Sequence, residues 1–123
     1  MKFYSAVFNV SEWKILTPDY AERTLKGRPG NFRMKVALAL LGNIELELVQ
    51  PLEGESLNAQ FLQSHGDGLH HVASFVSNIA ESIARLNNLG FKVVQSGKRP
   101  GAEFAYLQNP EEPSIIIELL KRS

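Results

Sequence analysis

The sequence contains no cysteine and only three histidines among its 123 residues. The absence of cysteine excludes a disulfide scaffold and any metal site built on thiolates. A metal ion would therefore have to be held by histidine nitrogens and carboxylate oxygens. No apolar run approaches the roughly 18–20 residues needed to cross a bilayer, and no signal-peptide pattern opens the chain, so we expect a cytoplasmic protein.

The chain also lacks a net charge, because thirteen Lys and Arg residues balance thirteen Asp and Glu residues. No net field is present to attract nucleic acid or an anionic membrane, and we expect neither as a partner. With 44% hydrophobic residues, a chain of this length is typical of one compact globular domain.

The second half of the sequence predicts a strand, a helix and three further strands. LHHVASFV, residues 69–76, is a β-type run that follows a Gly-Asp-Gly turn. Asn78 with Glu81 three positions later predicts the start of a helix, and Gly90 stands where a left-handed C-terminal cap belongs. The later strands are expected at residues 91–95, 103–107 and 115–120, with a loop at 97–101 and a turn at 109–113.

The first half predicts a similar order without an opening strand. Residues 1–8 resemble the end of a helix, residues 12–17 read as a strand, and residues 19–31 read mostly as loop, with some strand at 21–25. Two strands, 34–40 and 44–49, are joined at Gly42-Asn43, which is a strong hairpin signal. A short helix is expected at residues 60–64, between the halves.

An internal repeat relates the two halves. IELEL, ending at Leu48, falls on IIIEL, ending at Leu119, so Glu47 becomes the counterpart of Glu118. Glu118 lies 47 residues after His71, and the position 47 residues before Glu47 lies before Met1. The repeat partner of His71 is therefore expected upstream of Met1. The predicted fold class is therefore α+β with paired βαβββ modules: an incomplete first module (1–51), a linker (52–67) and a second module (68–123), in one domain.

Three side chains stand out as candidates for chemistry. Glu118 lies inside the apolar run SIIIELL, and a buried carboxylate without a partner costs several kcal/mol, so it either turns to water or meets a positive group. A single strand histidine such as His71 is more often a hydrogen-bonded core or surface group than a ligand. Glu47 shares its strand face with Glu45, which is typical of a solvated face. Taken together, however, the three residues form a set that a divalent ion would organise.

Three segments carry a resemblance to a known family: GLHHVASFV, GNIELELVQPLEG and IIIELL. They look like the vicinal oxygen chelate superfamily of glyoxalases, bleomycin-resistance proteins and extradiol dioxygenases. PLEGES with FLQSHGDGLHHVA most resembles the methylmalonyl-CoA epimerase-like branch. The resemblance implies two modules curled into a cup-shaped mixed sheet around a divalent metal ion, which would be Zn, Ni, Co, Mn or Fe.

The resemblance also implies roles for individual residues. Glu47, His71 and Glu118 would be the metal ligands, while His70 would point to the other face of its strand. The family's fourth ligand, a histidine in the opening strand, has no counterpart in this sequence. The second acid/base carboxylate of the epimerase falls at Asn31, which cannot take up a proton.

The implied function is a metal-dependent lyase or isomerase that acts on a small carbonyl or thioester substrate. Glu118 would abstract a proton, and the metal would stabilise the resulting enolate. The alternative is a non-catalytic protein of the bleomycin-resistance type that binds or sequesters a small molecule.

Expectations also follow for two further residues and for the oligomeric state. Arg99 lies in an expected loop, where it would either grip a phosphate or carboxylate of the substrate or remain solvated. His65 is expected at the surface. Without an opening strand the first sheet has a bare edge, and we expect a homodimer or a strand exchange to cover it.

Overall fold

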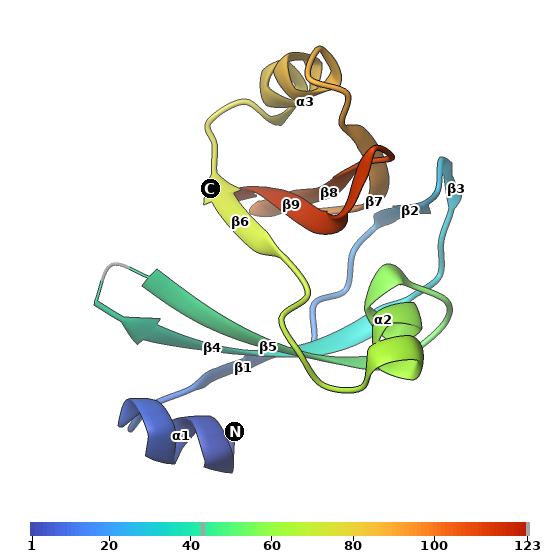
Figure 1. Cartoon of the computed structure of the whole chain (residues 1–123). Coiled ribbons are helices and arrows are strands. Elements are labelled where there is room, and N and C mark those ends of the chain that lie inside the picture. The colour runs from blue at the N-terminus through green and yellow to red at the C-terminus, as the bar shows by residue number, and fades with distance from the viewer. Residues whose placement is uncertain (43, 123) are drawn as a thin grey trace.

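The computed structural model describes residues 1–42 and 44–122 of the chain, which contain three helices and nine strands (Figure 1). The helices are α1 (Lys2–Phe8), α2 (Leu57–His65) and α3 (Ile79–Asn87). The strands are β1 (Lys14–Leu16), β2 (Glu22–Leu25), β3 (Arg28–Pro29), β4 (Arg33–Leu41), β5 (Ile44–Glu53), β6 (Val72–Phe75), β7 (Lys92–Arg99), β8 (Ala102–Asn109) and β9 (Glu112–Arg122).

The strands form two sheets that face each other. One has the order β1-β4-β5 and the other the order β3-β2-β7-β8-β9-β6. All pairings are antiparallel except that of β6 with β9, which is parallel. The helix-and-strand order α3-β7-β8-β9 repeats α1-β1-β4-β5, which confirms the α+β class with paired modules. Within the described residues, β5 pairs only with β4, whereas β9 is flanked on both sides.

The larger sheet separates two apolar clusters. On the side covered by α3, Ile79 and Leu86 pack against Ala105, Leu107 and Leu119. The opposite face looks toward the smaller sheet, and its Phe104 and Tyr106 form a second cluster with residues at the start of β4, namely Phe32, Met34 and Val36. Because β9 is covered on both faces, its sequence is a nearly continuous apolar run.

Several local predictions are confirmed by specific contacts. The Asn78 side chain accepts a hydrogen bond from the Glu81 backbone N–H at 3.1 Å, as expected for a helix N-cap. Gly90 has φ +92°, which an L side chain rarely adopts. β4 and β5 follow each other across Gly42, although Asn43 of the predicted hairpin turn lies outside the described residues.

Several predicted boundaries are wrong: β5 extends to Glu53, into the expected linker, and β9 begins at Glu112, inside the expected turn. Three further differences bear on the site. β6 begins at Val72 and not at residue 69, so His71 precedes the strand. β7 continues through Arg99, where a loop was expected, because residues 95–99 pair with β8 and 95–98 also pair with β2. Gly97 is needed within β7, because a side chain at this position would occupy the space that the rings of Tyr20 and Phe104 fill. α2 begins at Leu57, and the Ser56 side chain caps it by accepting from Ala59 N at 3.0 Å.

Candidate functional site

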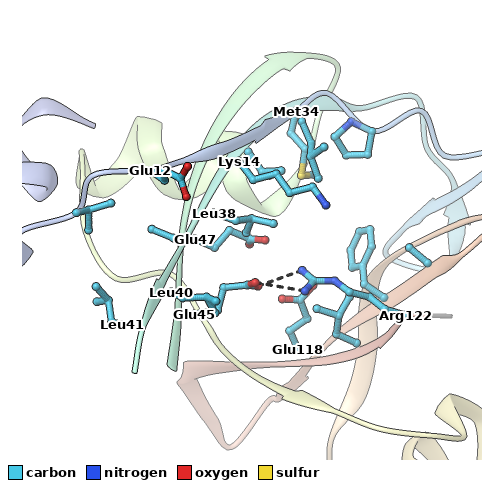
Figure 2. Close-up of a pocket in the computed structure, with 18 of the residues that line it drawn as sticks. Glu12, Lys14, Met34, Leu38, Leu40, Leu41, Glu45, Glu47, Glu118 and Arg122 are labelled. Carbon is cyan, nitrogen blue, oxygen red and sulfur yellow. Dashed lines mark hydrogen bonds and ion pairs between the residues drawn. The ribbon is translucent and has the colours of Figure 1, made fainter. Parts of the chain in front are cut away.

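A cavity of about 860 Å³ lies between the two sheets. It is lined from below by β1, β4 and β5, and from above by the ends and inner faces of β7, β8 and β9. Figure 2 shows Glu45, Glu47, Glu118 and Arg122 directed into this space from opposite walls. The cavity inside the predicted cup is therefore lined both by apolar side chains and by charged side chains that point into it.

Glu47 and Glu118, which line the cavity, meet at His71. His71 Nε2 lies 3.1 Å from Glu118 Oε1 and 3.4 Å from Glu47 Oε1. Glu118 comes from the middle of β9, where it alternates inward with Ile116 and Leu120. Its side chain is only 7% exposed, so it does not turn to water. The positive partner that a buried carboxylate requires is His71.

The three side chains fit the donor set of a divalent metal ion. One atom from each lies within 4.8 Å of the others. Two bonds of roughly 2.0–2.2 Å to a shared ion allow donor atoms up to about 4.4 Å apart. The distances of 3.1 and 3.4 Å from His71 Nε2 to the two carboxylates satisfy this limit. One imidazole with two carboxylates is a set suited to borderline and hard cations, and all three residues predicted as ligands are brought together.

Burial and neighbouring charges set the protonation states of His71 and Glu118. Burial would lower the pKa of His71, but hydrogen bonds to Glu118 and Glu47 outweigh that effect and raise it to about 9. Burial raises the pKa of Glu118, while its hydrogen bond to His71 acts against this and the neighbouring Glu47 adds to it. Both directions mean that the ion-free cluster holds one proton tightly, and we place it on His71.

His70 does not point away from the site, contrary to the prediction from strand alternation. Because β6 begins only at Val72, the two histidine rings lie on the same side, and His70 Nδ1 is 2.9 Å from His71 Nδ1. Burial, with the charge of His71, lowers the pKa of His70 to about 4, so the ring is neutral. The Leu57 backbone lies near enough to act against that shift, but its geometry falls short of a hydrogen bond to the buried Nε2.

Arg122 is a site residue that sequence reasoning missed. Its guanidinium binds both oxygens of Glu45, at 3.0 and 3.3 Å, as the dashed lines in Figure 2 show. Glu45 therefore belongs to an ion pair across the cavity and is not a solvated neighbour of Glu47. The signal was present in β9, since Arg122 lies four residues after Glu118 and so on the same face.

Arg99 lines the cavity, at the end of β7 and not in the predicted loop. Its guanidinium carbon lies 6.0 Å from the centre of the Tyr20 ring, and its Nε is buried without a hydrogen-bond partner in the described part of the chain. Burial, followed by the charge of Glu118, raises the pKa of Tyr20 to about 12, so its hydroxyl stays protonated. Tyr20 was also missed, because nothing in its loop sequence marks it.

The two remaining predicted positions lie apart from the cluster. His65 is exposed at the end of α2 and stacks on Phe61, as the surface interpretation required. Asn31 is exposed, does not line the cavity, and lies against Gly54. Of the described helices, none is long and apolar enough to cross a membrane.

Solved structures share this architecture. The crystal structure of hypothetical protein BH1468 from Bacillus halodurans C-125 is 27% identical with a TM-score of 0.67, covering 98% of this chain and 82% of that one. A structure of methylmalonyl-CoA epimerase in complex with methylmalonyl-CoA and NH4+ is 18% identical with a TM-score of 0.62, covering 99% of this chain and 83% of that one. At 18% identity, the second likeness concerns the fold alone.

Sequence comparison gives the family. The uncharacterized protein YqjC of Bacillus subtilis (strain 168) is 29% identical over 90 residues, which are 71% of this chain and 64% of that protein. The aligned part is thus slightly less than two thirds of that relative's length. A family model described as Glyoxalase/Bleomycin resistance protein/Dioxygenase superfamily matches residues 1–106. Because this match covers most of its length, the chain belongs to the glyoxalase/bleomycin resistance protein/dioxygenase superfamily.

Proposed function

We propose that this protein is a metal-dependent lyase or isomerase that removes a proton next to the carbonyl of a small carbonyl or thioester substrate. The observation that carries the proposal is the cluster of Glu47, His71 and Glu118, two of which, Glu47 and Glu118, line a cavity large enough for a small molecule. Cavities of about 300 to 1,000 Å³ are typical of small-molecule sites.

Each of the four predicted site residues has a role in this proposal. Glu47, His71 and Glu118 would hold a divalent ion, which supplies polarisation of a carbonyl bound beside it. Glu118 would accept and return the substrate proton, because its carboxylate is directed into the cavity beside the place where the ion and the substrate carbonyl would lie. Arg99 would bind an anionic part of the substrate, because it carries a charge that no carboxylate of the described residues neutralises.

Metal binding is the first test. Addition of zinc, nickel, cobalt or manganese to chelator-treated protein should raise its free energy of unfolding by about 2.7 kcal/mol when the free ion is at a hundredfold excess over its dissociation constant. Glu118→Gln should lose most of this gain but keep the fold. Glu45→Gln is the matched control, since it removes a charge from the same cavity but leaves the three ligands in place.

Proton transfer is the second test. Wild-type protein loaded with its ion should exchange the hydrogen next to the carbonyl of acyl thioesters for deuterium in D2O, as followed by proton NMR, and Glu118→Gln should not. If the protein instead binds acyl thioesters but exchanges no hydrogen of any of them, the result would favour the sequestering function.

We also infer that the protein is a homodimer. The tip of the β4–β5 hairpin exposes Leu40 by 77% and Ile44 by 66%, and the outer edge of β5 is unpaired within the described residues. Exposed apolar side chains beside an open strand edge are a combination that favours association. A second copy of the chain would cover them.

A further inference from the structure

The two adjacent histidines of the site touch each other in an unusual way. Neighbouring side chains on an extended backbone normally point to opposite faces. Here the His70 and His71 rings are nearly perpendicular, at 86°, and their Nδ1 atoms lie 2.9 Å apart. A contact of this length between two ring nitrogens is a hydrogen bond, and one nitrogen must donate while the other accepts.

The surroundings of His71 decide which nitrogen donates. Its Nε2 is directed at Glu118 and Glu47, at 3.1 and 3.4 Å. If Nε2 is to bind an ion, it must offer a lone pair, and the ring proton must then be on Nδ1. The Nδ1–H of His71 can donate only if His70 Nδ1 accepts, so the proton of His70 is on its Nε2.

His70 is held for this purpose by aromatic neighbours. Its ring lies edge-on to Phe61 of α2, with centroids 5.2 Å apart, and 5.6 Å from the ring of Tyr106. The hydroxyl of Tyr106 accepts a hydrogen bond from Asn58 at 3.2 Å, and the Asn58 side chain in turn accepts one from Gln95 at 3.0 Å. The orientation of His70 is thus fixed by a network that joins α2, β7 and β8.

The far side of the same ring gives a second, independent observation. His70 Nε2 is buried and has no hydrogen-bond partner in the part of the chain that the structure describes. A buried polar atom without a partner costs folding free energy and requires an explanation. Packing alone would be served as well by leucine. The imidazole at position 70 is explained by its other nitrogen, Nδ1, which is hydrogen-bonded to His71.

We propose that His70 is a positioning residue, which accepts a hydrogen bond from His71 Nδ1 and thereby fixes the His71 ring with its Nε2 lone pair toward Glu47 and Glu118. This inference rests on the proposed function, because the Nε2 lone pair matters only if the cluster binds an ion. His70 itself has no contact with the ion or the substrate in this arrangement. Its contribution is to the tautomer and the orientation of His71.

Two substitutions at position 70 separate hydrogen bonding from packing. His70→Leu keeps an apolar group against Phe61 and Tyr106 but removes the acceptor. His70→Asn restores an acceptor, because the Asn Oδ1 takes the place of the histidine Nδ1. His65→Leu is the matched control, since His65 also stacks on Phe61 but does not touch His71. Thermal unfolding of each variant shows that it is folded.

The readouts are zinc affinity, measured by competition with a chelator, and the tautomer of His71 in the zinc-loaded protein, measured from its ring ¹⁵N shifts. We expect His70→Leu to weaken zinc binding about 10- to 100-fold, as is usual for partners behind ligating histidines, and to mix the two tautomers of His71. His70→Asn and His65→Leu should stay close to wild type. Wild-type affinity with an unchanged tautomer in His70→Leu would overturn the proposal, as would a folded His70→Asn that is as weak as His70→Leu.

Failure of the proposed function is distinguishable from failure of this inference. If wild-type protein binds none of the ions, the proposed function is wrong. The hydrogen bond is then judged in the ion-free protein by ¹⁵N–¹⁵N coupling between the two Nδ1 atoms. Coupling in wild type supports the hydrogen bond between His70 and His71, and absence of coupling in wild type contradicts it.

Discussion

Glu118 shows how one charged side chain is kept in an apolar strand. It takes an inward position of β9, directly across from Tyr106 on β8, and receives its counter-charge from a histidine that lies next to another strand. An unpaired carboxylate at this depth would become neutral through desolvation. The cluster therefore couples the charge state of Glu118 to that of His71.

This coupling predicts a pH dependence for the ion-free protein. The folded-state pKa of His71 is about 9, above the unfolded value of about 6.5, so the stabilisation is full below pH 6.5 and is lost as the pH rises toward 9. The raised pKa of Glu118 acts in the same direction at lower pH. Urea unfolding should show a loss of about 1 to 3 kcal/mol across this window.

Substitution identifies the source of that loss. Glu118→Gln removes the hydrogen-bond acceptor that contributes most to raising the His71 pKa, so its stability should change less between pH 6.5 and 9. Glu45→Gln should keep the wild-type slope. An equal slope in wild type and Glu118→Gln would show that His71 is not protonated by this pairing.

The residues of the site differ in how far the sequence predicts them. Glu47 and Glu118 are found because an internal repeat aligns them, and because an acidic residue in an apolar strand is conspicuous. Tyr20 is not, since its position depends on a loop and on the space left by Gly97, which lie far apart in the chain. The contact of His70 with His71 was missed because strand alternation was applied one residue before the strand begins.

At the scale of elements, α2 is fixed to the larger sheet by the side chain of Gln95. This residue is fully buried in β7; its oxygen accepts from Leu57 N at 2.7 Å, and its nitrogen donates to Asn58 at 3.0 Å. Its amide thus satisfies one free N–H of the first turn of α2 and one side chain of the helix. The helix in turn places Phe61 against His70.

We expect Gln95→Leu to destabilise the protein by about 2 to 4 kcal/mol, because a backbone N–H and a buried amide oxygen lose their partners while the volume is kept. Gln50→Leu, on the exposed side of β5, is the control and should stay within about 0.5 kcal/mol of wild type. The free energy of unfolding from urea titration is the measurement. Equal effects in the two variants would mean that the network does not fix α2.

The elements themselves were predictable where patterns are strong and local. α3, with its cap and its apolar spacing, and the long strands β4, β5 and β9 follow from the sequence. β2 lies within the strand expected at residues 21–25, but β3 and the full length of β7 do not follow from the sequence. β3 is formed by pairing with β2, and residues 95–98 of β7 pair with residues 22–25, which no local pattern reveals.

At the scale of the molecule, the inferred homodimer can be tested at the β4–β5 tip. Leu40→Lys should shift sedimentation velocity toward the monomer at micromolar concentration, because a charge would be placed in the apolar contact. Leu89→Lys is the control, since Leu89 is 60% exposed but lies just beyond α3. A wild-type protein that stays monomeric at high micromolar concentration would contradict the homodimer.

The two sheets share no strand pairing in the described residues, yet Glu47 belongs to one while Glu118 belongs to the other and His71 lies next to it. An ion held by all three would act as a clasp, so that the smaller sheet could not open by itself without releasing it. Amide hydrogen exchange should register this: zinc should slow exchange in β4 and β5 more than in α3, whose contacts lie entirely within the second half. If zinc slowed amide exchange equally in β4, β5 and α3, the two sheets would already open together without the ion, and the clasp would be contradicted.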